Sequence, residues 1–221
     1  MQKRSINLTF HGIGEPPRQL EPGEADVWVS RDRFVALLDA AAGRDDVRIT
    51  FDDGNASDVG HALPALAERG LHATFFVVAG RMGTPGFVDA GQVRELTAAG
   101  MGIGCHGMRH RPWRGLDGDA LREELVEAKA VLEEVVERPV TAAACPFGSY
   151  DRRVLGATRD AGYGTVFTSD RGTTRPGDFV QARNSVGPHT EPDLLGRIAA
   201  LDDRLHRSLP RRAKLAVKRW R

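Results

Sequence analysis

Two adjacent carboxylates and two histidines four residues apart are the side chains of this sequence best suited to chemistry. Asp52 and Asp53 precede Gly54, and His106 and His110 lie further along the chain. Two imidazoles and one carboxylate would form a three-ligand metal site with positions left for water and substrate. The second carboxylate would then be free to accept a proton. Taken separately, the Asp-Asp-Gly run could equally be a turn, and the histidines could be surface residues of a basic loop.

The elements around these residues decide between the two interpretations. Apolar runs typical of strands occupy residues 5–10, 47–51, 73–79, 102–105, 140–145, 165–168 and 179–182. Helical periodicity occupies residues 31–42, 57–69, 89–99, 119–136, 152–161 and 192–206. Strands separated by helices pair in parallel through right-handed crossovers, so we expect an α/β fold with about seven parallel strands, barrel-like or doubly wound.

In either architecture, the residues that follow the strands gather at one edge of the sheet. His11 follows the first expected strand, Asp52 and Asp53 follow the second, and His106 follows the fourth. Pro146 begins the segment after the fifth. The topology therefore predicts that the carboxylates and histidines lie close together, which favours a shared site over isolated surface residues.

The bulk properties are those of an ordinary soluble domain. The chain has 221 residues, of which 41% are hydrophobic and 28% charged, with a formal net charge of +1. This charge points to no particular partner, and the absence of a recognised nucleic-acid-binding motif leads us to expect no nucleic-acid partner. Two cysteines cannot form a disulfide framework. No apolar run is long enough to span a bilayer or to form the core of a signal peptide, so we expect a cytoplasmic protein.

The distribution of charge suggests a domain over residues 1–203 and a basic tail over residues 204–221. The tail holds eight Arg or Lys residues among leucine, valine and tryptophan. It could form an amphipathic helix at the inner face of an anionic membrane, which would suit a lipid-linked substrate. A solvated basic tail is the alternative. The sequence says nothing about oligomeric state.

The motifs resemble those of the polysaccharide deacetylases, carbohydrate esterase family 4, whose domain is called the NodB homology domain. The family's TFDDG signature is intact from Thr50 to Gly54. The second signature, usually H-[S/T]-x-x-H-P, reads HGMRHRP from His106 to Pro112. The third reads PFGSY from Pro146 to Tyr150. The resemblance extends over residues 5–185.

The resemblance implies a deformed (β/α) barrel and a divalent metal, with zinc expected. Cobalt, nickel or iron would suit the same ligands. By the family pattern, Asp52 is the general base, and Asp53, His106 and His110 bind the metal. The backbone N–H near Phe147 stabilises the oxyanion, and the substrate-binding residues around it are Pro146 and Tyr150.

Two departures from the family pattern bear on the mechanism. Gly107 replaces the hydroxyl residue of the second motif, and Ala144 stands where many members have an arginine that orients the base. A late Leu-x-His motif that supplies the general acid elsewhere is also missing. The sequence is more similar to the branch that includes deacetylases of poly-N-acetylglucosamine export. That similarity implies His11 as the acid, with His189 as the alternative.

The sequence thus predicts a metal-dependent hydrolase that removes an N-acetyl group from an amino sugar, glycan or glycoconjugate. A deformylase or cyclic-amide hydrolase on the same fold is one alternative. A degenerate carbohydrate-binding relative without catalytic activity is the other, and the departures at Gly107 and Ala144 keep it open.

Overall fold

The computed structural model describes residues 4–191, 193–205 and 217. Its nine strands form one sheet in the order β7-β1-β2-β3-β4-β5-β6-β8, with β9 also paired to β1. The strands are β1 (Ser5–Phe10), β2 (Val47–Asp53), β3 (Ala73–Val77), β4 (Gly102–Cys105), β5 (Ala142–Ala144), β6 (Thr165–Thr168), β7 (Thr173–Thr174), β8 (Val180–Ala182) and β9 (Asn184–Ser185). All pairings are parallel except that of β7 with β1.

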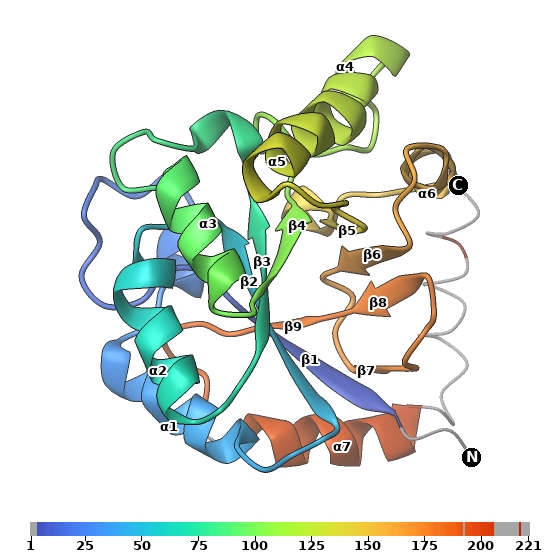
Figure 1. The fold of residues 1–221 in the computed structure, drawn as a ribbon. Helices are drawn as coiled ribbons and strands as arrows, with labels where there is room; N and C mark the ends of the chain where they lie inside the picture. The colour runs from blue at the N-terminus through green and yellow to red at the C-terminus, as the bar shows by residue number, and fades with distance from the viewer. Residues whose placement is uncertain (1–3, 192, 206–216, 218–221) are drawn as a thin grey trace.

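One short segment nearly closes the sheet into a barrel. Strand β8 pairs with β6 at one edge, and β9 pairs with β1 near the other. Arg183 alone separates these two strands. The chain therefore crosses from one edge of the sheet to the other within six residues, as Figure 1 shows.

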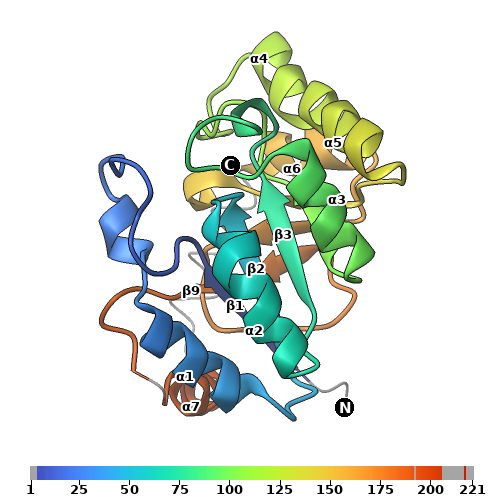
Figure 2. The same ribbon diagram turned by 60° about the vertical axis from the view of Figure 1, so that its left-hand side comes forward.

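Helices surround the barrel. They are α1 (Arg31–Ala41), α2 (Leu63–Glu68), α3 (Ala90–Ala98), α4 (Gly118–Arg122), α5 (Ala128–Val136), α6 (Arg152–Asp160) and α7 (Leu194–Leu205). Single π-helical turns, at Asp58–Ala62 and Glu123–Glu127, lead into α2 and join α4 to α5. Short 3-10 helices occupy Glu24–Val27, Ala79–Arg81 and Pro146–Gly148. Helix α7 packs against β1 and β7 and lies under the amino end of β1 (Figures 1 and 2).

The two faces of the sheet differ in polarity. On the outer face, stacked phenylalanines pack beneath α1, with the Phe51 and Phe75 rings 4.6 Å apart. On the inner face the side chains are largely polar, and the Thr9 and Thr50 hydroxyls lie 2.9 Å apart. Strand side chains alternate between the two faces of a sheet. The outer face therefore supplies most of the apolar core, and polar side chains occupy much of the barrel interior up to the carboxyl ends of the strands.

The structure confirms the expected α/β barrel, and its strands and helices match the expected ranges closely. Strands β7 and β9 were not expected, because a two-residue strand has no periodicity to detect. The expected boundary at residue 203 falls within α7, and the basic tail lies almost wholly outside the described residues. Within the described part of the chain, no helix is long and apolar enough to cross a membrane.

Candidate active site

A pocket of about 470 Å³ opens at the carboxyl ends of the strands. Both carboxylates that follow β2 line it, as do the histidines that follow β1 and β4 and the phenylalanine that follows β5. Its full lining is His11, Glu21, Pro22, Gly23, Glu24, Val27, Asp52, Asp53, His106, His110, Phe147, Ser169 and Ser185. The topology thus brings together side chains from distant parts of the sequence, as parallel strands dictate.

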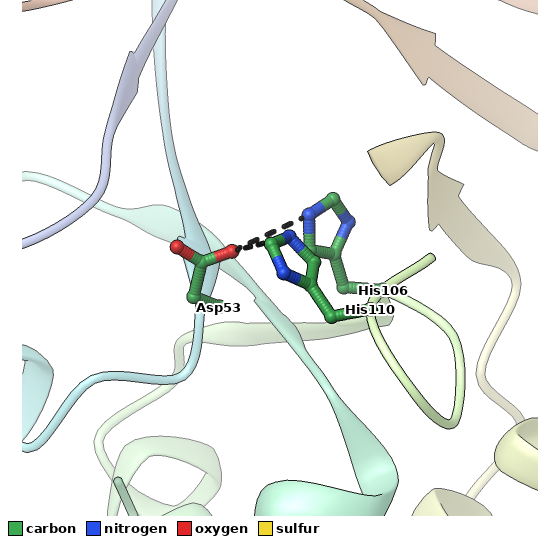
Figure 3. A group of neighbouring side chains, drawn as sticks. All are labelled: Asp53, His106 and His110. Carbon is green, nitrogen blue, oxygen red and sulfur yellow. Dashed lines mark ion pairs between the residues drawn. The ribbon is translucent and has the colours of Figure 1, made fainter. Parts of the chain in front are cut away.

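Asp53, His106 and His110 form the cluster best suited to a metal ion. One ligand atom from each residue lies within 4.8 Å of the others. Nε2 of His110 is 3.1 Å from Oδ1 of Asp53, and Nε2 of His106 is 3.5 Å from the same oxygen. Figure 3 shows both imidazoles turned toward this carboxylate. Among the described residues, this is the one such group of histidine, cysteine and acidic side chains.

Backbone contacts prepare His106 to bind a cation. Its Nδ1 lies 2.8 Å from the carbonyl oxygen of Ala144, which can only accept, so Nδ1 donates and Nε2 carries the lone pair in the neutral ring. Burial lowers the pKa of His106 to about 4, and the opposing charge of Asp52 does not offset this effect. A neutral imidazole with a fixed tautomer is the form that binds metals.

The backbone at Asp53 explains how two consecutive residues reach one pocket. Strand side chains alternate between faces, so Asp52 and Asp53 would ordinarily point apart. Asp53 adopts a φ of 77°, in the left-handed region that aspartate tolerates better than most residues. Burial alone would raise the pKa of Asp53, but the close contact with His110 and the charges of His11 and His106 lower it instead. Asp53 is therefore ionised, as a metal ligand must be.

Arg183 holds the other carboxylate. Its two terminal nitrogens lie 2.5 and 2.6 Å from the two oxygens of Asp52, which is the bidentate geometry of a strong ion pair. Its guanidinium also lies over the Phe76 and Phe167 rings, at 5.2 and 5.8 Å. Burial would raise the pKa of Asp52, but the charge and hydrogen bonds of Arg183, together with the nearby imidazoles of His106 and His11, outweigh burial and lower it.

Sequence reasoning missed this role of Arg183. It noted that Ala144 lacks the arginine seen in many family members, and that position is part of the small apolar cluster inside the barrel. The arginine comes instead from the segment that closes the barrel. An available signal was an arginine directly after the last expected strand, which would be buried if that strand completed the sheet.

His11 lies next to Asp52 in the pocket. Of the other expected site residues, Phe147 lines the pocket and His189 does not. Nε2 of His11 is 3.9 Å from Oδ2 of Asp52, and its side chain is largely buried. His189, the alternative acid, is exposed and does not line the pocket. Phe147 does line it; the residue is 66% exposed, and its ring lies 4.8 Å from that of His110.

The remaining residues of the third motif lie behind the pocket. Pro146 and Tyr150 are buried and are not part of the lining. The Tyr150 hydroxyl donates to Asp170 at 2.5 Å, which fixes the segment that carries Phe147. Their expected role in substrate binding stays a prediction, and these contacts indicate an indirect one.

The loop between β1 and α1 forms the opposite wall. Arg18 donates to both oxygens of Glu24 at 2.7 Å and to the side chain of Asn55 at 3.0 Å. Arg18 and Arg81 both lie over the Phe87 ring. These contacts fasten the loop to the segments that follow β2 and β3.

Comparisons with known sequences agree with the motifs. The family model described as "Polysaccharide deacetylase" matches residues 39–166. YxkH of Bacillus subtilis is 26% identical over 179 residues, which are 80% of this chain and 62% of YxkH. A chitooligosaccharide deacetylase of Rhizobium leguminosarum bv. trifolii is 30% identical over 141 residues, 62% of this chain and 64% of that protein. The chain thus spans less than two thirds of these relatives.

Solved structures share the fold. The deacetylase PplD of Streptococcus pyogenes, in complex with acetate, has a TM-score of 0.77 at 21% identity, over 90% of this chain and 99% of PplD. IcaB of Ammonifex degensii has a TM-score of 0.71 at 24% identity, over 90% of this chain and 97% of IcaB. At these identities the likeness concerns the barrel and its helices.

Proposed function

Because the chain belongs to the polysaccharide deacetylase family, we propose that it hydrolyses the amide bond of an N-acetylated sugar and releases acetate and a free amine. The observation that carries this proposal is the pair of adjacent carboxylates in one pocket, with different partners. Asp53 faces two imidazoles, whereas Asp52 is held by Arg183. One carboxylate can therefore bind a cation while its neighbour handles a proton.

The residues present fit a divalent metal. Asp53, His106 and His110 would hold it, and zinc is the ion we expect for two nitrogens and one oxygen. Oδ1 of Asp53 is buried, and no donor in the described part of the chain makes a well-aligned hydrogen bond to it. Cobalt, nickel or iron would satisfy the same donors. When bound, the metal supplies Lewis acidity toward the amide carbonyl and makes water more acidic.

Asp52 would act as the general base. Its lowered pKa keeps it ionised near neutral pH, so it can accept the proton of the attacking water. Arg183 occupies one acceptor position on each oxygen, and each carboxylate oxygen has a second. The ion pair with Arg183 thus fixes the Asp52 carboxylate in one orientation, while each oxygen can still accept a further hydrogen bond or a proton.

His11 would act as the general acid. Its place beside Asp52, largely shielded from solvent, puts a third imidazole in the pocket next to the proposed base. Protonated, this ring could donate to the departing amine, which an unassisted amide does not release readily. The exposed position of His189, outside the pocket, supports His11 over it.

The substrate would be a chain or conjugate of N-acetylhexosamine. Phe147 presents an exposed ring at the pocket rim, where the apolar face of a sugar could pack. Its backbone N–H would help to stabilise the oxyanion, a contact typically worth about 3–4 kcal/mol. The names of the relatives, which mention chitooligosaccharide and peptidoglycan, support this class of substrate.

The test is an acetate-release assay on the purified, zinc-loaded protein. The panel would contain nucleotide-linked, lipid-linked and oligosaccharide N-acetylhexosamines, with N-formyl sugars as matched controls. We expect acetate release from at least one N-acetylated substrate and its loss after chelation, with recovery when zinc is restored.

Formate release without acetate release would favour the deformylase alternative. A protein that binds one equivalent of metal and a glycan, yet releases no acyl group, would instead indicate a carbohydrate-binding relative. Lipid-linked and soluble substrates in the same panel would show whether a carrier lipid matters.

A further inference from the structure

The loop that carries both histidines rests on a buried carboxylate. Glu124 lies in the π-helical turn between α4 and α5, and its side chain is 0% exposed. Its oxygens accept hydrogen bonds from the backbone N–H of Met108 at 2.9 Å and of Arg109 at 3.2 Å. The Arg111 side chain donates to it through Nε at 2.8 Å. One carboxylate therefore receives three donors from the segment that includes His110.

Gly107 makes room for this carboxylate. A Cβ atom at position 107 would lie 2.2 Å from Oε2 of Glu124, far closer than two atoms can approach. Gly107 also has a φ of 84°, which disfavours any side chain. The glycine that departs from the family motif and the buried Glu124 are thus two parts of one arrangement.

The other side of the loop is fixed by backbone contacts. The N–H of Ala79 donates to the Gly107 carbonyl at 2.9 Å, and that of Gly80 donates to Met108 at 3.0 Å. Between these contacts and Glu124, His110 adopts a φ of 52°, which is uncommon for a residue other than glycine. Such a conformation persists when the surrounding structure over-determines it.

We propose that Glu124 is a positioning residue for the metal centre, and this inference rests on the function proposed above. By holding the N–H groups between the two ligands, Glu124 would keep His106 and His110 aimed at Asp53 before a metal arrives. Arg111, the residue inserted before Pro112, supplies the cation that a buried carboxylate requires. Loss of the carboxylate would leave the loop free to relax and the imidazoles spread over several orientations.

The experiment compares Glu124→Gln with Glu123→Gln. Glu123 is the matched control, because it pairs with Arg109 and Arg111 but, in the described structure, accepts no backbone N–H of the loop. Zinc affinity would be measured by competition with a chromophoric chelator, and the coordination geometry by the visible spectrum of the cobalt form. We expect Glu124→Gln to weaken zinc binding about 10- to 100-fold, as loss of a supporting partner does elsewhere. The control should stay within about threefold of wild type.

Zinc affinity and a cobalt spectrum that both match wild type in Glu124→Gln would overturn the inference, as would equal losses in the two variants. If Glu124→Gln does not fold, as judged by circular dichroism without metal, Arg111→Gln takes its place. It should weaken zinc binding less than tenfold but measurably more than Glu123→Gln, and equal affinities would again overturn the inference. A wild-type protein that binds no zinc would refute the proposed metal centre itself, which is a different result.

Discussion

The carboxylates at the end of β2 and the carboxylate at the start of the helical turn that follows are all buried, yet their pKa values shift in opposite directions. Asp52 and Asp53 end β2 at the pocket, and Asp58 begins the helical turn that follows. All three are buried. The pKa values of the first two are lowered, whereas burial and the charges of Asp53 and Asp52 raise the pKa of Asp58 well above its ordinary value.

The difference lies in the partners. Asp52 has Arg183, and Asp53 has two imidazoles. No donor among the described residues forms a hydrogen bond to either oxygen of Asp58. Burial therefore does not decide the ionisation of a carboxylate in this protein. The ionisation is decided by whether a cation or a hydrogen-bond donor lies close to the carboxylate, and such groups are concentrated in the pocket.

Removing the carboxylate that faces the imidazoles should have the largest effect. Asp53→Ala deletes one of three candidate ligands, so we expect zinc binding and acetate release to fall to background. Metal content by mass spectrometry and the acetate assay would measure this. Full metal content together with full activity would show that Asp53 does not bind the metal.

Removing only the charge of Asp52 should separate metal binding from proton transfer. Asp52→Asn should retain zinc but lower kcat by about 10²–10⁴, the range typical of a general base. It also leaves the buried Arg183 without its counter-ion, so the free energy of unfolding should fall by about 3 kcal/mol. Turnover by zinc-loaded Asp52→Asn that equals wild type would remove Asp52 as the base.

The smallest effect is expected at Asp58, where the substitution should stabilise the protein instead of weakening it. Since its folded pKa is raised, the folded state keeps a proton that the unfolded state loses above about pH 4. The contribution of Asp58 to the free energy of unfolding should therefore decrease as the pH rises from about 4 toward neutrality, opposite in sign to the contribution of His106. Asp58→Asn removes this penalty and should stabilise the metal-free protein at neutral pH by on the order of 1 kcal/mol.

Urea unfolding of the chelated Asp58→Asn protein at pH 4 and pH 7 would measure this effect. The difference from wild type should be larger at pH 7 than at pH 4. A loss of stability at both values would show that the ionised Asp58 carboxylate has a partner that the neutral amide cannot replace.

The pattern of apolar runs and helical periods was sufficient to predict a parallel α/β fold, and the family motifs, not this pattern, pointed to the barrel. The sequence also predicted that Asp53, His106 and His110 would lie together, since parallel strands bring their carboxyl ends to one edge. What it could not reveal were side chains whose role depends on three-dimensional closure. Arg183 follows an expected strand, but only the completed barrel directs it to Asp52.

Glu124 shows a second limit. In the sequence it is one of several acidic residues on a long amphipathic helix, where a charged side chain ordinarily faces solvent. The π-helical turn changes which residues face inward, and that single-turn irregularity has no signature in the pattern of apolar residues. The positive φ at Asp53, which directs it to the pocket, is likewise set by its surroundings.

The way in which the barrel closes has a consequence for biosynthesis. The Asp52–Arg183 pair joins positions 131 residues apart. At about 5–20 residues per second, a ribosome would add Arg183 roughly 7–26 s after Asp52. During that interval the nascent chain carries its proposed base without a counter-ion. The ion pair can therefore form only after nearly the whole domain has been translated.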